Sequence, residues 1–124
     1  MYLLDTNTCI GYLKGRVVGV RQRLEAMPSS DVFVCSVVKA ELFYGAMKSL
    51  NPERTLARQQ EFLNRYISLP FDDQAALIFG QIRATLAALG TPIGPYDLQV
   101  AAITLVNSLT VVTGSSTRRF PLSL

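Results

Sequence analysis

The sequence contains no histidine and only two cysteines among its 124 residues. The absence of histidine excludes zinc sites built on imidazole, Ser-His catalytic triads and histidine general bases. Cys9 and Cys35 are too few and too far apart to form a disulfide framework or a metal knuckle, so we expect two buried thiols in a reducing cytoplasm. Any hydrolytic chemistry in this chain would therefore depend on carboxylates.

Long apolar runs are also missing. No stretch approaches the roughly twenty apolar residues that cross a membrane, and the chain opens without a recognisable signal sequence. Apolar residues nevertheless make up 49% of the composition, which is enough for the core of a small protein. We therefore expect one cytoplasmic domain over residues 1–124, without a membrane partner.

The charge balance is mildly basic. Twelve Lys and Arg stand against nine Asp and Glu, which gives a net charge of +3, and nine of the twelve cations are Arg. The guanidinium group matches the geometry of phosphate, so a polyanionic partner such as RNA is compatible with this composition. A charge of this size also serves solubility alone, so it does not decide the function.

Apolar runs and turn residues predict alternating strands and helices. Ser36 is expected to cap the helix after the second strand, and Gly15 and Gly90 are expected to end helices. This alternation predicts an α/β domain with a mostly parallel sheet and helices on both faces. Strands are expected at 2–4, 32–35, 67–69 and 110–112, and helices at 6–14, 17–27, 36–49, 52–66, 73–89 and 97–106.

Three acidic residues hold special positions in this pattern. Asp5 follows the first strand, Glu41 lies just over one turn into the helix after the second strand, and Asp97 begins the helix before the last strand. Ligands of parallel sheets bind beyond the carboxyl ends of the strands, so the three carboxylates should meet at one edge. Clustered carboxylates need hard cations to offset their repulsion, and Mg²⁺ or Mn²⁺ is the usual choice.

Each of the three acids also has a simpler interpretation. Asp5 and Asp97 are suited to capping helices, and Glu41 fits a narrow polar strip on a helix surface. The helix around Glu41 is apolar almost all round, which favours a position at the edge of the interior, where a carboxylate needs a cation or an Arg as partner. A phosphotransferase or receiver-like domain with Asp5 as covalent nucleophile is a weaker alternative, because Asn7 replaces a second Asp and no partnering Lys follows the last strand.

Three segments resemble, in order, the VapC-type toxins, which are the PIN-domain ribonucleases of toxin–antitoxin pairs. They are 3-LLDTNTCIGYLKGR-16, 40-AELFYGAMKS-49 and 91-TPIGPYDLQVAA-102, the last followed by 110-TVVT-113. The resemblance implies a Rossmann-like PIN fold and a Mg²⁺- or Mn²⁺-dependent endoribonuclease that cuts tRNA or another structured RNA. It also implies a homodimer and inhibition by a cognate VapB-type antitoxin, with residues 51–69 and the apolar third helix as the contact surface.

The resemblance carries the catalytic and metal-binding roles onto Asp5, Glu41 and Asp97, and supporting polar roles onto Asn7 and Thr113. The tail, 113-TGSSTRRFPLSL-124, departs from the family pattern. Ser115 or Ser116 stands where another oxygen ligand is expected, and a hydroxyl binds metal more weakly than a carboxylate or amide. The short tail also implies a truncated edge strand. A catalytically impaired protein that binds antitoxin or RNA is therefore the alternative function.

Overall fold

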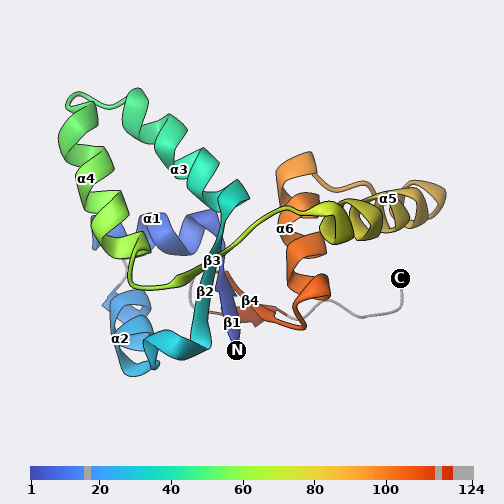
Figure 1. The fold of residues 1–124 in the computed structure, drawn as a ribbon, viewed down its shortest axis with the longest axis horizontal. Coiled ribbons are helices and arrows are strands. Elements are labelled where there is room, and N and C mark those ends of the chain that lie inside the picture. Colours follow the sequence, from blue (N-terminus) through green and yellow to red (C-terminus); the bar gives the residue numbers. More distant parts are fainter. Residues whose placement is uncertain (16–17, 114–115, 119–124) are drawn as a thin grey trace.

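The structure is a computed structural model and describes residues 1–15, 18–113 and 116–118 of the chain. A five-stranded sheet forms its centre, in the order β3-β2-β1-β4-β5 (Figure 1). Strands β1 to β4 are parallel, and β5 is antiparallel to β4. The strands are β1 (Tyr2–Leu4), β2 (Val32–Cys35), β3 (Ile67–Leu69), β4 (Thr110–Thr113) and β5 (Ser116–Arg118).

Helices cover both faces of the sheet, which confirms the predicted α/β fold. Figure 1 shows α1, α2 and α4 on one side of the sheet and α5 and α6 on the other. Apolar side chains therefore project from both faces of the central strands, as a doubly covered sheet requires. The helices are α1 (Thr6–Lys14), α2 (Val18–Ala26), α3 (Ser36–Met47), α4 (Pro52–Leu63), α5 (Asp73–Ala88) and α6 (Pro95–Val106).

Strand β1 lies at the centre of the sheet and pairs on both edges. Tyr2 is in register with Val32 of β2 on one side and with Thr110 of β4 on the other. The N–H of Thr110 also donates to the carbonyl of Met1 at 3.1 Å, so pairing reaches the first residue of the chain. Leu3 and Leu4, which follow in β1, are fully buried.

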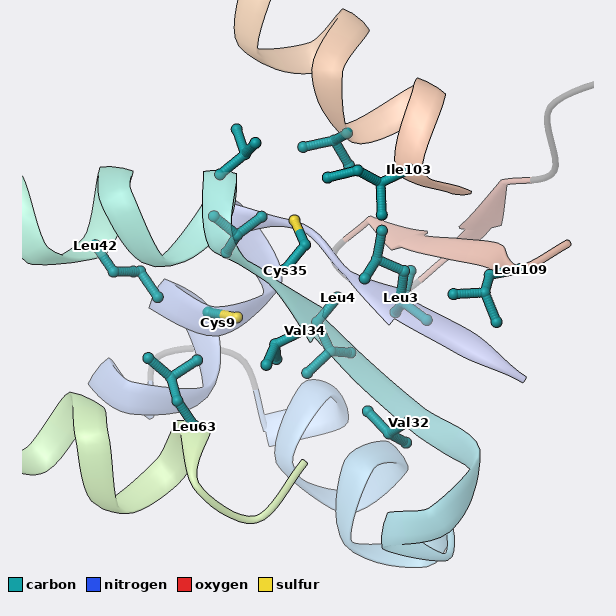
Figure 2. Packing of buried hydrophobic residues seen from close by; sticks show 14 of the residues in the cluster. Leu3, Leu4, Cys9, Val32, Val34, Cys35, Leu42, Leu63, Ile103 and Leu109 are labelled. Carbon is teal, nitrogen blue, oxygen red and sulfur yellow. The ribbon is translucent and has the colours of Figure 1, made fainter. Parts of the chain in front are cut away.

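The core packs against this strand from both directions (Figure 2). Cys9 of α1 and Leu63 of α4 lie on one side of the sheet, and Ile103 of α6 lies on the other. Both cysteines are buried and unpaired, which confirms the expectation of two free thiols. Among the residues that the structure describes, no helix is both long enough and apolar enough to cross a membrane.

Most helix boundaries lie within three residues of the predicted ones. Helix α4 ends at Leu63 rather than at 66, α6 begins at Pro95 rather than at 97, and the predicted cap of α3 is wrong. Gly15 and Gly90 end α1 and α5 with positive φ angles of 64° and 72°. Ser36, however, is already the first helical residue of α3, and Cys35 occupies the cap position without a side-chain hydrogen bond. The Ser36 hydroxyl instead accepts a hydrogen bond from the N–H of Phe71 at 3.3 Å, so the predicted cap was wrong.

Residue patterning alone did not indicate strand β5. Residues 116-STR-118 have no apolar alternation, so nothing in the pattern indicated a strand there. The strand exists through its pairing with β4, in which Thr117 is in register with Val112. The resemblance implied a truncated edge strand in the tail, and the edge strand that the structure describes, β5, has three residues.

Candidate active site

The carboxyl ends of β1, β2 and β4 share one edge of the sheet, because these strands are parallel neighbours. The chain builds β2 and β3 on one side of β1 and then crosses to place β4 on the other side. Such a reversal of strand order opens a crevice at the carboxyl ends of the two strands that it separates, here β1 and β4. Asp5 is the first residue after β1 and therefore lies at this point.

Asp5 is held in place by hydrogen bonds on both its backbone and its side chain. Its N–H donates to the carbonyl of Val112 at the end of β4 at 3.3 Å. Its Oδ1 accepts from the N–H of Thr8 at 2.8 Å and so caps α1. A carboxylate has two oxygens and about four acceptor positions, so this cap leaves capacity for another ligand. The capping and ligand-binding interpretations of Asp5 are therefore compatible.

Glu41 lies half-buried on α3, and its partner is a hydroxyl. Its Oε1 accepts a hydrogen bond from the Oγ1 of Thr6 at 3.0 Å. The structure adds a neutral threonine as hydrogen-bond partner, and the expected cation partner of Glu41 stays a prediction. Because Thr6 directly follows Asp5, this bond brings the α3 carboxylate to the turn that carries Asp5.

Asp97 is exposed in the first turn of α6. Gly94 caps this helix without any side-chain hydrogen bond, and Pro95 is its first residue, so the alternative that Asp97 is the cap was wrong. A carboxylate in the first turn interacts favourably with the helix dipole. Helix α6 runs back toward the amino end of β4, so its first turn lies at the edge where the parallel strands end.

The three carboxylates do not form a ready-made cluster. Within residues 1–15, 18–113 and 116–118, no three Asp, Glu, Cys or His side chains stand close enough together to hold one metal ion. Asp5 and Glu41 are linked through Thr6, and α3 packs against α6, which carries Asp97. The donor set consists of hard carboxylate oxygens, which fits Mg²⁺ or Mn²⁺ in chemistry.

The two thiols near this edge are poor candidates for chemistry. Burial raises the pKa of Cys9, and the negative charge of Asp5 raises it further. Burial also raises the pKa of Cys35, with a smaller upward contribution from Glu41. Both side chains are therefore protonated at neutral pH, whereas a metal ligand or nucleophile requires the thiolate. They belong to the core under the site.

A hollow of about 610 Å³ lies between α1, α3 and α4. Glu41 lines it together with two cationic side chains, Lys14 and Arg58, and its apolar lining includes Ile10, Leu13 and Leu42. The candidate site therefore borders a larger concave surface that carries positive charge.

The model of the PIN domain family matches residues 2–115 of the chain. The chain belongs to the PIN-domain family. A tRNA(fMet)-specific endonuclease VapC of Salmonella typhimurium is 45% identical over 114 residues, which cover 92% of this chain and 86% of the relative. The corresponding VapC of Shigella flexneri is 41% identical over 119 residues, 96% of this chain and 89% of the relative.

Solved structures agree with this PIN-domain assignment. The DNA-bound VapBC structure from Salmonella typhimurium aligns with a TM-score of 0.81 and 44% identity, covering 87% of this chain and 81% of that chain. The DNA-bound VapBC2 structure from Rickettsia felis aligns with a TM-score of 0.84 and 29% identity, covering 90% of this chain and 86% of that chain. The chain is a VapC-type toxin, and the predictions of a PIN fold and of a toxin-type endoribonuclease are confirmed.

The structure describes two of the three supporting polar residues, Asn7 and Thr113. Asn7 is exposed at the start of α1, and the backbone of Thr113 ends β4 at the edge that carries Asp5. Ser115 lies outside the described residues. Sequence reasoning missed Thr6 and Thr8, which tie Asp5 to Glu41 and to β4. Two β-branched residues in the first turn of a helix were the available signal, because threonine has low helix propensity.

Proposed function

We propose that this VapC-type protein hydrolyses RNA phosphodiester bonds with Asp5, Glu41 and Asp97 as the ligands of Mg²⁺ or Mn²⁺. The observation that supports the proposal is the hydrogen bond from Thr6 to Glu41, which joins the α3 carboxylate to the turn of Asp5 at the point where the strand order reverses. A divalent cation bound there would polarise the phosphodiester and lower the pKa of a bound water.

The chain's own residues have distinct parts in this proposal. Asp5 is the fixed ligand, because its cap and its backbone bond to Val112 hold it. Glu41 is steered by Thr6, and the exposed Asp97 is free to turn toward the other two carboxylates. Asn7, Thr113 and Ser115 are proposed as additional oxygen donors, and their neutral groups would contribute less to binding than the carboxylates.

We propose tRNA as the substrate, because the Salmonella and Shigella relatives are named tRNA(fMet)-specific endonucleases. We also propose a cognate VapB-type antitoxin as partner, since the solved relatives are VapBC complexes, and the apolar lining of the hollow suits a protein segment. RNA and such an antitoxin both occur in the cytoplasm, where we propose that the protein acts.

We further propose a homodimer. Three large apolar side chains at the end of α3 and just beyond it are exposed: Tyr44 at 65%, Met47 at 54% and Leu50 at 107%. Within this chain, α3 buries only Val37, Val38, Leu42 and Ala46 among its described residues. A second copy that covers the exposed side chains would remove an unfavourable apolar surface.

The test is cleavage of total tRNA by the purified protein, freed of any bound partner, with Mg²⁺ or Mn²⁺ and with EDTA. Asp5→Asn and Asp97→Asn should each lower the cleavage rate more than about 100-fold, because each removes the charge of a metal ligand. Mutation of a residue that only hydrogen-bonds a metal ligand already costs about 10- to 100-fold in activity. Asparagine caps helices as well as aspartate, so Asp5→Asn should still fold. Asp73→Asn, in the exposed first turn of α5, is the matched control and should leave the rate unchanged.

Two results would overturn the proposed mechanism. Full cleavage in EDTA would exclude the metal, and full cleavage by both Asp variants would exclude these ligands. A wild-type protein that binds tRNA or its antitoxin but never cuts RNA would instead be the catalytically impaired binding protein that the unusual tail suggested.

A further inference from the structure

Three arginines converge on the carboxyl end of α1 and form what we term the arginine cluster: Arg21, Arg58 and Arg65. The Nε of Arg21 donates to the carbonyl of Tyr12 at 2.9 Å. The Nη2 of Arg58 donates to the carbonyl of Leu13 at 3.1 Å. The Nη1 of Arg65 donates to the hydroxyl of Tyr12 at 2.9 Å. Residues from α2, from α4 and from the segment after α4 thus meet at one place.

The ring of Tyr12 organises two of these side chains. The guanidinium carbon of Arg21 lies 5.1 Å from the ring centroid, and that of Arg65 lies 5.8 Å from the same centroid. The ring itself stacks on Phe62 at a centroid distance of 4.5 Å, and Phe62 is buried. The tyrosine is therefore anchored in the core, and the two guanidinium groups beside it are oriented before any ligand binds.

The cluster retains unused charge and unused hydrogen-bond donors. All three arginines are exposed, and so is the neighbouring Lys14. None of these four cations has a salt-bridge partner within the described part of the chain, although Glu61 acts through space on Arg65. Capping the end of α1 occupies one N–H of a guanidinium group that has five. The remaining N–H donors are available to bind an anionic ligand.

We propose that the arginine cluster binds backbone phosphates of the RNA substrate beside the cleavage site. This inference rests on the proposed function. A guanidinium group binds a phosphate through two parallel hydrogen bonds. Positive charge on a protein surface supplies most of the sequence-independent affinity for nucleic acid. The anchored tyrosine and oriented arginines suit a repeating anionic backbone better than one carboxylate of a protein partner.

The cluster and the candidate site are connected along α1. Asp5 caps the start of this helix and the cluster caps its end, so nine residues at 1.5 Å each separate them by about 14 Å. The hollow between α1, α3 and α4 is lined both by Glu41 and by Lys14 and Arg58. An RNA strand that presents a phosphate to Asp5 and Glu41 therefore reaches the cluster within a few nucleotides.

The experiment measures binding rather than cleavage. In an Asp97→Asn background, the dissociation constant for total tRNA is measured by fluorescence anisotropy over a series of NaCl concentrations. The added pair Arg21→Gln and Arg65→Gln should weaken binding roughly tenfold at low salt. It should also lower the slope of log affinity against log salt by about 1.5, because each lost phosphate contact contributes about 0.7 to 0.9.

Arg83→Gln is the matched control. Arg83 is also exposed and its guanidinium carbon lies 5.9 Å from the ring of Phe79, but it is on α5, on the opposite side of the sheet. It should leave both the affinity and the slope unchanged. Circular dichroism of each variant checks that the fold is retained.

Unchanged affinity and slope in the double variant would overturn the inference, as would an equal loss with Arg83→Gln. If the double variant keeps its RNA affinity but no longer binds its antitoxin, the cluster is a protein site and the inference is wrong. Failure of the proposed function has a different signature, because wild-type protein would then cut no RNA even if the cluster bound it.

Discussion

Thr8 should contribute measurably to stability through one hydrogen bond between α1 and β4. Its side chain is fully buried, and its Oγ1 donates to the carbonyl of Val112 at 2.7 Å. Thr8→Val keeps nearly the same shape and removes this donor. A lost buried hydrogen bond costs about 1 to 2 kcal/mol. For a chain of this size, the melting temperature should fall by roughly 4 to 8 °C.

Thr104→Val is the matched control for this change. Thr104 is also buried and also donates at 2.7 Å to a carbonyl, but its acceptor is Val100, one turn earlier in its own helix. Such back-bonding of a threonine to its own helix contributes little to helix stability and joins no two elements, so its loss should be nearly neutral. Differential scanning calorimetry measures both variants. Equal melting temperatures for the two would refute the claim that the bond to β4 matters more than local bonding within a helix.

Two further predictions concern the thiols and a glycine. Because the pKa of the buried Cys9 thiol is raised, its protonated form stabilises the fold below about pH 9. Above that pH the unfolded thiol ionises first, so the Cys9 contribution should lower the free energy of unfolding by up to about 1.4 kcal/mol per pH unit. Urea titrations of Cys9→Ala should show a smaller loss than the wild type, because only the buried Cys35 thiol then contributes. Gly15→Ala should lower the free energy of unfolding by about 1 to 2 kcal/mol, because φ is 64° at this position. Gly80→Ala, within α5, should instead stabilise the protein, because alanine favours a helix more than glycine does. Equal melting temperatures of the two variants would contradict this prediction.

The sequence predicted the elements whose signals are local. The apolar strand Val32–Cys35, the helix stop at Gly15 and the Asp-led start of α1 were all expected, because each depends on a few neighbouring residues. Strand β5 depends instead on pairing with β4, and Ser36 lost its cap role to a contact with Phe71 that lies 35 residues away. Such long-range contacts leave no periodic signal in the chain.

Parallel topology predicted that Asp5, Glu41 and Asp97 lie at one edge of the sheet. The structure links Glu41 to the turn of Asp5 through Thr6, whereas a shared site of all three carboxylates stays a prediction. The interactions of each carboxylate depend on side-chain rotamers, which a pattern of residue types does not specify. The arginine cluster was similarly invisible, because Arg21, Arg58 and Arg65 meet only through the fold, although the abundance of arginine was plain from composition.

The pairing of Tyr2 with Thr110 has a consequence for how the protein is made. The central strand is synthesised more than 100 residues before its neighbour β4, so the sheet closes only after residues 110–113 have emerged. Asp5 is held by Val112 of that late segment. A growing polypeptide therefore cannot hold Asp5 in its final position before Val112 has left the ribosome, so the candidate site forms late relative to the turn that carries Asp5.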